Sequence, residues 1–262
     1  MRHWASTGAG RGRRDEGLQA PLASRLSALV PRPSSLVSHP TGSELLDDSS
    51  ADVAQVRESL GNIARANRWF GGAWAVRWAM TRILRNAPVA DSLVLLDVGA
   101  GAGDLARVAQ SAARARGVNL RVLCLDRHPI AAGLAAAAGC ASVAADAGAL
   151  PVADHAVDIV LMSQLVHHFD ARSAVLLLRE AARVARCGVI VADLQPSRLA
   201  AALFRPAARA LGFDRVTVHD GLTSLRRAYT VPELAMLMKH AGLRARVTRR
   251  PGWRIVALAD LP

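Results

Sequence analysis

The sequence has little cysteine and no long apolar run. Cys124, Cys140 and Cys187 are its three cysteines, and their odd number and lack of C-x-x-C spacing argue against a disulfide framework or a zinc site. They favour a reducing, cytoplasmic setting, and we expect no metal. No run of about 18 uncharged apolar residues occurs, so we expect no membrane span. Residues 1–4 do not open an obvious secretion signal, because no apolar segment with a cleavage site follows them.

Lysine is also nearly absent. Lys239 is the single lysine, so 33 − 1 = 32 of the basic residues are arginine, and the formal net charge is +12. A charge this positive invites a nucleic-acid partner. However, arginine and alanine both have GC-rich codons, and the arginines are spread along the chain instead of forming one basic stripe. We therefore expect no specific nucleic-acid partner.

The chain is organised around residues 93–105, which read LVLLDVGAGAGDL. The stretch opens as a continuous apolar run, as expected of a strand that is buried on both faces. Glycines at alternating positions then allow a tight turn against which a ligand can lie, and residues 104–109 read as the start of a helix. Strand, glycine turn and helix form the corner of an open α/β sheet that cradles a phosphate or a nucleoside.

Two acids in this stretch indicate which ligand it holds. Asp104 stands where a dinucleotide loop, G-x-G-x-x-G, has its third glycine, and a carboxylate at a helix start repels a diphosphate. Asp97 lies two residues before the first glycine, so a cationic ligand fits better. The stretch resembles motif I, D-x-G-x-G-x-G, of the class I S-adenosylmethionine (SAM) methyltransferases. By that resemblance Asp97 faces the ammonium end of the cofactor. The loop that lines its methionine and ribose portions is then Gly99, Ala100, Gly101 and Gly103.

The chain from residue 91 to 261 alternates between predicted strands and helices. The strands are expected at 93–97, 121–125, 141–145, 157–162 and 188–192, and the helices at 104–115, 129–139, 172–186, 197–211 and 230–242. Residues 244–249 and 253–259 flank Pro251-Gly252 and predict a terminal hairpin. Five β-α units and a hairpin match the class I methyltransferase sheet. We therefore expect an α/β fold with a doubly wound, seven-stranded, mostly parallel, Rossmann-like sheet.

Two additions precede this methyltransferase domain, which is expected over residues 89–262. Residues 1–48 mix glycine, serine, proline and arginine, the composition of a flexible and disordered extension, and we expect no catalytic role for them. Residues 49–88 carry apolar residues at helical spacing, interrupted by Gly71-Gly72, which predicts a helical cap. In the family that the chain resembles, such an addition often covers the cofactor and shapes the substrate pocket.

Acids also end the second and third predicted strands. Asp126 ends the second strand, where a carboxylate can accept hydrogen bonds from both ribose hydroxyls, and the segment that contains it and Arg127 matches the family's second motif. Asp146 ends the third strand and is followed by Ala147, at the place where the family reads the adenine amino group with an acid and a backbone amide. Because successive strand ends converge on one crevice, these acids and Asp97 together favour a SAM site.

Residues 161–169 follow the fourth strand and resemble the corresponding segment of the ubiquinone/menaquinone-type and related small-molecule methyltransferases. The resemblance implies that the backbone at Ser163 lies beside the methionine moiety, and that His167 and His168 face the methyl-transfer end of the pocket. A histidine can act as the base for a phenol or hydroxyl group, and we favour His168. A structural hydrogen bond to nearby backbone is the alternative role for each histidine.

Residues 219–229 have the length and polarity of a lid loop and resemble a segment of bacterial natural-product methyltransferases. His219 in this segment either polarises the acceptor or holds the loop through hydrogen bonds to the backbone.

The predicted activity is transfer of a methyl group from SAM to a small hydroxylated, phenolic or quinol-like acceptor in secondary metabolism. O-methylation is favoured over C-methylation. The N/D-P-P-Y/F tetrapeptide of amino-group methyltransferases does not occur, and no cysteine lies in the Pro-Cys context of cytosine C5 enzymes. Two alternatives stay open: an RNA methyltransferase, favoured by the charge, and a SAM-binding protein without catalysis.

Overall fold

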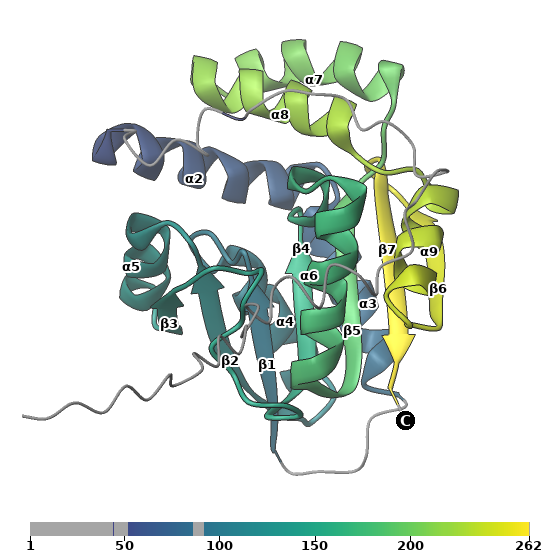
Figure 1. Ribbon diagram of the computed structural model, residues 1–262. Coiled ribbons are helices and arrows are strands. Elements are labelled where there is room, and N and C mark those ends of the chain that lie inside the picture. Colours follow the sequence, from purple (N-terminus) through teal and green to yellow (C-terminus); the bar gives the residue numbers. More distant parts are fainter. Residues whose placement is uncertain (1–43, 45–51, 86–91, 262) are drawn as a thin grey trace, which may run out of the picture. The chain divides into compact units, whose positions relative to one another are not determined.

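The computed structural model describes residues 44, 52–85 and 92–261, and its strands form a seven-stranded sheet in the order β3-β2-β1-β4-β5-β7-β6 (Figure 1). The first five strands along the chain run parallel, and β7 pairs antiparallel with both β5 and β6. The strands are β1 (Ser92–Val98), β2 (Asn119–Asp126), β3 (Ala141–Ala144), β4 (Val157–Ser163), β5 (Ala185–Leu194), β6 (Ala245–Arg250) and β7 (Arg254–Asp260). The predicted doubly wound class I sheet is confirmed.

Strand β1 lies in the middle of the sheet, between β2 and β4. Leu95 and Leu96, which point to opposite faces, are both at most 1% exposed, as the continuous apolar run predicted. In the register of the strands, Asp97 lies opposite Cys124 on one side and Leu161 on the other. Because these strands are parallel, the residues that follow each of them come together at one edge of the sheet.

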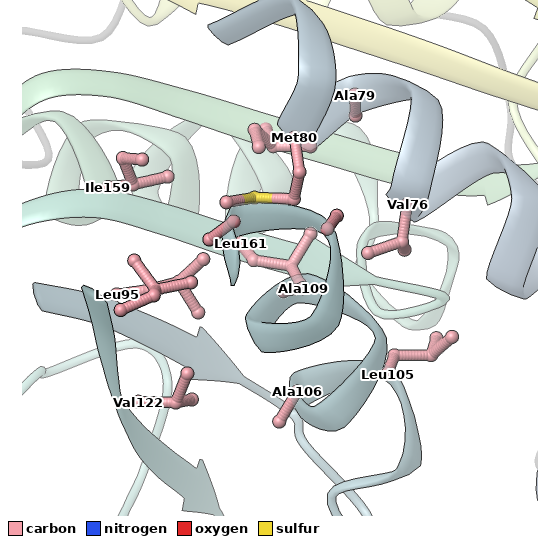
Figure 2. Close-up of a cluster of buried hydrophobic side chains, with 14 of the residues drawn as sticks. Val76, Ala79, Met80, Leu95, Leu105, Ala106, Ala109, Val122, Ile159 and Leu161 are labelled. Carbon is pink, nitrogen blue, oxygen red and sulfur yellow. The ribbon is translucent and has the colours of Figure 1, made fainter. Parts of the chain in front are cut away.

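One face of the sheet is covered by α3 (Gly72–Ile83) and α4 (Asp104–Arg114). Figure 2 shows Val76 and Met80 of α3 in one buried cluster with Leu95 of β1 and Leu161 of β4. Full burial of an apolar side chain of this size is worth about 1.5–3 kcal/mol. This layer therefore fixes β1 and α4, the two elements that the glycine turn joins. Helix α3 lies within residues 49–88, where a helical cap was predicted, and it packs on this face of the sheet.

The other face carries α6 (Ala171–Val184) and α9 (Val231–His240), in front of the sheet in Figure 1. Leu177 and Leu178 of α6 are fully buried. Helix α9 begins with a capping box, in which Thr230 and Glu233 bond each other's backbone amides. Helix α5 (Pro129–Ala137) packs beside β2 and β3.

Three helices lie across the edge at which the parallel strands end: α2 (Val53–Trp69), α7 (Arg198–Ala210) and α8 (Arg215–Arg227) (Figure 1). Asn62 of α2 donates from Nδ2 to Asp214 Oδ2 at 2.6 Å, which joins α2 to the N-terminus of α8. These helices face the ends of the strands (Figure 1).

The prediction of a lid loop over residues 219–229 is wrong, because most of this segment belongs to α8. Asp214 caps the helix by accepting a hydrogen bond from the Thr217 amide at 2.9 Å. Leu222 and Leu225, three residues apart, bury one side of it. The polar residues between them concealed this helical spacing.

The other predicted elements lie within a few residues of the observed ones. Helix α6 ends at Val184 because the chain joins the sheet earlier than predicted, where Ala185 pairs with Val157 of β4. Apart from Glu44, the predicted extension over residues 1–48 lies outside the described residues. No helix in the described part of the chain is long and apolar enough to cross a membrane.

Candidate active site

A cavity of about 460 Å³ lies where β1, β2 and β4 end. The loops that follow these strands line one side of it, and α2, α7 and α8 line the other. The side chains and backbone that the three helices contribute are Val56, Leu60, Ile63, Ala66, Asn67, Ala200, Leu203, Phe204, Ala207, Thr217, Asp220, Gly221, Ser224 and Leu225. The carboxyl ends of the strands are where open α/β sheets bind their ligands.

The glycine turn between β1 and α4 forms one wall of this cavity. Gly99 and Gly101 have φ angles of 71° and 54°, in the left-handed region that favours glycine. The Gly99 amide donates to the Leu125 carbonyl at 2.8 Å, which ties the turn to the end of β2. A Cβ added at Gly101 would meet Leu60 Cδ2 of α2 at 3.4 Å, so a side chain there would occupy space between the turn and α2.

Asp97 lines the cavity, although its side chain is almost fully buried. Neither of its carboxylate oxygens has a hydrogen-bond partner within the described residues. Burial raises the pKa of Asp97 well above its usual range, and the nearby charges of Asp104 and Asp126 raise it further. An acid buried without partners is costly, so this position suits a cationic group of a ligand.

A second polar group lies next to the turn. Asp104, at the start of α4, accepts a hydrogen bond from Asn67 Nδ2 at 3.0 Å, and Gln164 donates from Nε2 to Asn67 Oδ1 at 2.6 Å. Burial raises the pKa of Asp104 in spite of the hydrogen bond from Asn67.

Arg254 of β7 also lines the cavity and donates from Nε to the Phe70 carbonyl at 3.0 Å. Burial lowers the pKa of Arg254 to about 10.

Asp126, at the end of β2, is held by backbone amides. Its Oδ2 accepts from the Gly101 amide at 2.8 Å and its Oδ1 from the His128 amide at 2.9 Å. Each carboxylate oxygen keeps a further acceptor position for a ligand hydroxyl. Asp146 follows β3 and accepts from the Gly148 amide at 2.7 Å, and its side chain also lies on the cavity wall.

His167 and His168 lie in a short 3-10 helix, Val166–His168, directly after β4. His167 is buried, with Nδ1 2.6 Å from Asp193 Oδ1, and its amide donates to Asp193 Oδ2 at 3.2 Å. Burial lowers the pKa of His167, but the charge and hydrogen bond of Asp193, together with Glu44, outweigh it and raise the pKa to about 9. The His168 side chain is more accessible, at 22% exposed.

Glu44 lies against both histidines. Its Oε1 is 3.4 Å from His167 Nε2 and its Oε2 is 3.6 Å from His168 Nε2, while Ser224 Oγ donates to Oε1 at 2.7 Å. The residue is 8% exposed and lines the cavity. It belongs to the part of the chain that was predicted to be an extension without a catalytic role, yet its side chain is part of this site.

The structure brings most of the predicted site residues together at the cavity. Those that line it are Asp97, Gly99, Ala100, Gly101, Asp126, Arg127, Asp146, Ala147, Ser163, His167 and His168. Gly103 does not: with a φ of 70° it turns the backbone into α4, and an added Cβ would meet Cys140 Sγ at 3.3 Å. His219 does not line the cavity either, since its half-exposed ring lies on α8, 3.0 Å from Asp220.

Several polar residues of the cavity did not enter the predicted set. Asn67, Glu44 and Arg254 line the cavity, and Asp193 contacts His167 from behind. None of these four residues stands in a motif that signals a site. Gln164 follows β4 with a φ of 53°, a conformation that non-glycine residues rarely adopt. This strained backbone holds its side chain on Asn67, which only the folded structure reveals.

Residues 96–192 match the family model described as a methyltransferase domain. The match begins in β1 and ends in β5, so it contains the glycine turn, Asp126 and both histidines of the site. A search of curated proteins gives no match.

Solved structures share the fold at low sequence identity. A SAM-dependent methyltransferase from Aquifex aeolicus has a TM-score of 0.54 and 16% identity, covering 81% of this chain and 100% of that one. An O-methyltransferase from neocarzinostatin biosynthesis, in complex with SAM and 2-hydroxy-5-methyl naphthoic acid, has a TM-score of 0.58 and 20% identity, covering 84% and 62%. Magnesium protoporphyrin IX methyltransferase from Synechocystis PCC 6803, with bound SAM, has a TM-score of 0.54 and 14% identity, covering 82% and 93%.

Proposed function

We propose that the chain is a class I SAM-dependent methyltransferase that methylates the oxygen of a small hydroxylated, phenolic or quinol-like molecule. Residues 96–192 match the methyltransferase domain model, and solved SAM-dependent methyltransferases share the fold. The proposal rests on one cavity that joins the acid-lined glycine turn to the histidine cluster. Its volume, about 460 Å³, is within the range of small-molecule sites. The walls from α2, α7 and α8 are largely apolar, as a ring-shaped acceptor of secondary metabolism requires.

The residues near the glycine turn fit SAM. Asp97 offers a buried carboxylate without a partner in the described chain to the ammonium group, and Gly101 leaves the turn open toward α2. We assign the free acceptor positions of Asp126 to the ribose hydroxyls, and Asp146 with the Ala147 amide to the adenine amino group. The remaining residues that we assign to the cofactor are Gly99, Ala100, Arg127 and Ser163, with Gly103 shaping the turn.

SAM supplies a sulfonium methyl group, which passes to the acceptor oxygen while the sulfur keeps the bonding electron pair and becomes a neutral thioether. The chain's own residues bind the acceptor, exclude water and handle the proton of its hydroxyl group. We place that hydroxyl beside His168, because His168 is the more accessible of the two histidines. His167, bonded to Asp193, acts as a positioning residue. Holding both reactants in one apolar pocket supplies much of the rate.

One solved structure of this fold, with an aromatic compound bound, supports this class of substrate. The neocarzinostatin enzyme was crystallised with 2-hydroxy-5-methyl naphthoic acid, a phenolic acid with two fused rings. The apolar side chains of α2 and α7, such as Ile63 and Phe204, offer surface against which rings of this kind can pack.

The test is methyl transfer from labelled SAM to a panel of phenols, naphthoic acids and quinols, with RNA as a competing substrate. We expect label on the oxygen of a small phenolic acceptor. His168→Ala should lower turnover by about 10²–10⁴-fold and leave SAM affinity unchanged. His219→Ala, outside the cavity, is the matched control and should retain full turnover. Transfer to RNA alone, or to no acceptor at all, would contradict the proposal and support one of the two alternatives.

A further inference from the structure

Glu44, His167 and His168 form a compact cluster of three ligand atoms on the cavity wall. These atoms, one from each side chain, all lie within 4.8 Å of one another. The two imidazole rings lie side by side, with centroids 4.4 Å apart and an angle of 33° between their planes. Both Nε2 atoms are directed at the same carboxylate.

Each imidazole nitrogen lies at a distance from the Glu44 carboxylate that two ligands of one metal ion can have. Zinc binds imidazole nitrogen and carboxylate oxygen at about 2.0–2.1 Å, so two ligand atoms at a tetrahedral angle lie about 3.3–3.4 Å apart. The observed Nε2–Oε distances are 3.4 Å for His167 and 3.6 Å for His168. Both exceed the length of a charged hydrogen bond, about 2.7–2.9 Å. The three side chains are therefore close enough together to bind one metal ion after a small adjustment.

The surrounding residues hold these side chains as metal sites require. A histidine that binds a metal through Nε2 usually donates its Nδ1 proton to a carboxylate, which fixes the tautomer and the ring orientation. Asp193 is in that position, 2.6 Å from His167 Nδ1, and it is itself held by the Leu194 amide at 2.7 Å. Ser224 orients Glu44 through its hydrogen bond at 2.7 Å.

We propose that Glu44, His167 and His168 bind a divalent transition-metal ion, best fitted by Zn²⁺, with a coordination position open to the cavity. Two imidazoles and one carboxylate suit zinc and its neighbours, whereas magnesium and calcium prefer oxygen ligands alone. Three protein ligands with an open position are typical of catalytic zinc sites, while structural sites use four. The cluster lines the cavity, so the open position faces the space that we assign to the acceptor.

The role of the ion deepens the proposed function and rests on it. An ion at this place lowers the pKa of an acceptor hydroxyl that contacts it. With the ion held by Glu44, His167 and His168, the proton of the hydroxyl group would pass to water instead of to His168, and the oxygen would accept the methyl group of SAM. His168 contributes as a ligand of the ion, so its loss lowers turnover without affecting SAM binding. Metal binding by itself does not depend on the identity of the acceptor.

The experiment measures metal binding directly, on the full chain without a histidine tag and after treatment with a chelator. Titration with ZnCl₂ and elemental analysis should give one ion per chain, with a Kd of about 1 μM or lower. Glu44→Gln and His168→Gln should each weaken binding by at least about 100-fold, and Asp193→Asn by about 10- to 100-fold. His219→Ala should bind as the wild type does. Calorimetry with SAM on each variant shows that it is folded.

The outcomes separate this proposal from the proposed function. Failure of the wild type to bind zinc, or equal zinc binding by Glu44→Gln and His168→Gln, overturns the metal site, and the three side chains are then a hydrogen-bonded network. Methylation of a phenol at the same rate before and after chelation leaves the proposed function intact and overturns the role of the ion in turnover. Stoichiometric zinc binding lost in the variants, with no methylation of any small acceptor, supports the metal site and contradicts the proposed function.

Discussion

Replacement of Asp97 with asparagine should stabilise the protein and at the same time weaken its binding of SAM. Asp97 is buried without hydrogen-bond partners in the described chain, and burial and two neighbouring acids raise its pKa well above the usual range. An uncharged side chain of the same shape removes this cost from the free protein. It also removes the charge that we assign to the ammonium group of SAM.

Both effects have a size that can be measured. A hydrogen bond to a charged group is worth about 1.5–3 kcal/mol, so the Kd for SAM should rise by about 10- to 150-fold. The asparagine amide still lacks partners, so the gain in unfolding free energy is only the charged part, about 1–3 kcal/mol. For a domain of this size each kcal/mol raises the melting temperature by about 2–4 °C.

The pH dependence follows from the raised pKa of Asp97. The folded protein keeps the Asp97 proton at pH values at which the unfolded chain has lost it. The stability that this provides is fully present below the ordinary aspartate pKa of about 3.9 and is lost as the pH rises through the raised pKa. The Asp97→Asn variant has no ionisable group at this position, so its stability does not fall in this way as the pH rises. The difference between the melting temperatures of the variant and the wild type should therefore grow with pH. SAM affinity of the wild type should rise over the same window, because the ammonium favours the ionised acid.

The assay is calorimetry with SAM and S-adenosylhomocysteine, which carry the same ammonium group, alongside thermal unfolding at several pH values. Asp158→Asn is the matched control at the start of the neighbouring strand. Asp158 Oδ2 accepts a hydrogen bond from the Val94 amide at 2.7 Å, so its loss should lower stability and leave SAM affinity unchanged. An Asp97→Asn variant with wild-type SAM affinity would refute the assignment of Asp97 to the ammonium group.

Three further substitutions or measurements test other parts of the site. Gly101→Val, at a φ of 54°, should weaken SAM binding by more than about tenfold by calorimetry, because the new side chain fills the space beside Leu60. Gly117→Val is the control for backbone strain alone, about 1–2 kcal/mol, because Gly117 has a φ of 75° and no atom lies within 4 Å of the added Cβ. Deletion of residues 1–36 should leave turnover nearly unchanged, whereas deletion of residues 1–45 removes Glu44 and should lower it; equal turnover of the two would exclude a role for Glu44. RNA binding, measured over a salt series, should be weak and vanish near physiological ionic strength; tight, sequence-selective binding there would contradict a small-molecule acceptor.

The sheet and the glycine turn could be predicted because their signals are local. A strand buried on both faces needs an apolar residue at nearly every position, and residues 93–96 meet this requirement without a break. The acids Asp126 and Asp146 end neighbouring strands, and parallel pairing alone brings their side chains to the edge where Asp97 lies. These parts of the site follow from the order of the elements.

The histidine cluster could not be predicted in the same way. Glu44 reaches His167 and His168 from a segment whose composition is that of an extension. No local pattern in the sequence around Glu44 indicates that it contacts the two histidines. Helix α8 was missed for a related reason. Its polar residues face α2 or the cavity: Thr217 accepts a hydrogen bond from Asn62 of α2, and Asp220 and Ser224 line the cavity. A stretch that looks solvent-exposed in sequence is therefore buried in the fold.

The charge of the chain illustrates why composition alone misleads about the ligand. The net charge is +12, yet the side chains that line the cavity include six carboxylates and two arginines. The carboxylates are Glu44, Asp97, Asp104, Asp126, Asp146 and Asp220, and the arginines are Arg127 and Arg254. Charges on an exposed surface are screened by salt, whereas charges in a partly buried cavity act on the ligand at close range. The acid-rich part of the cavity therefore favours the cationic groups of SAM and disfavours the phosphates that the arginine-rich composition would attract.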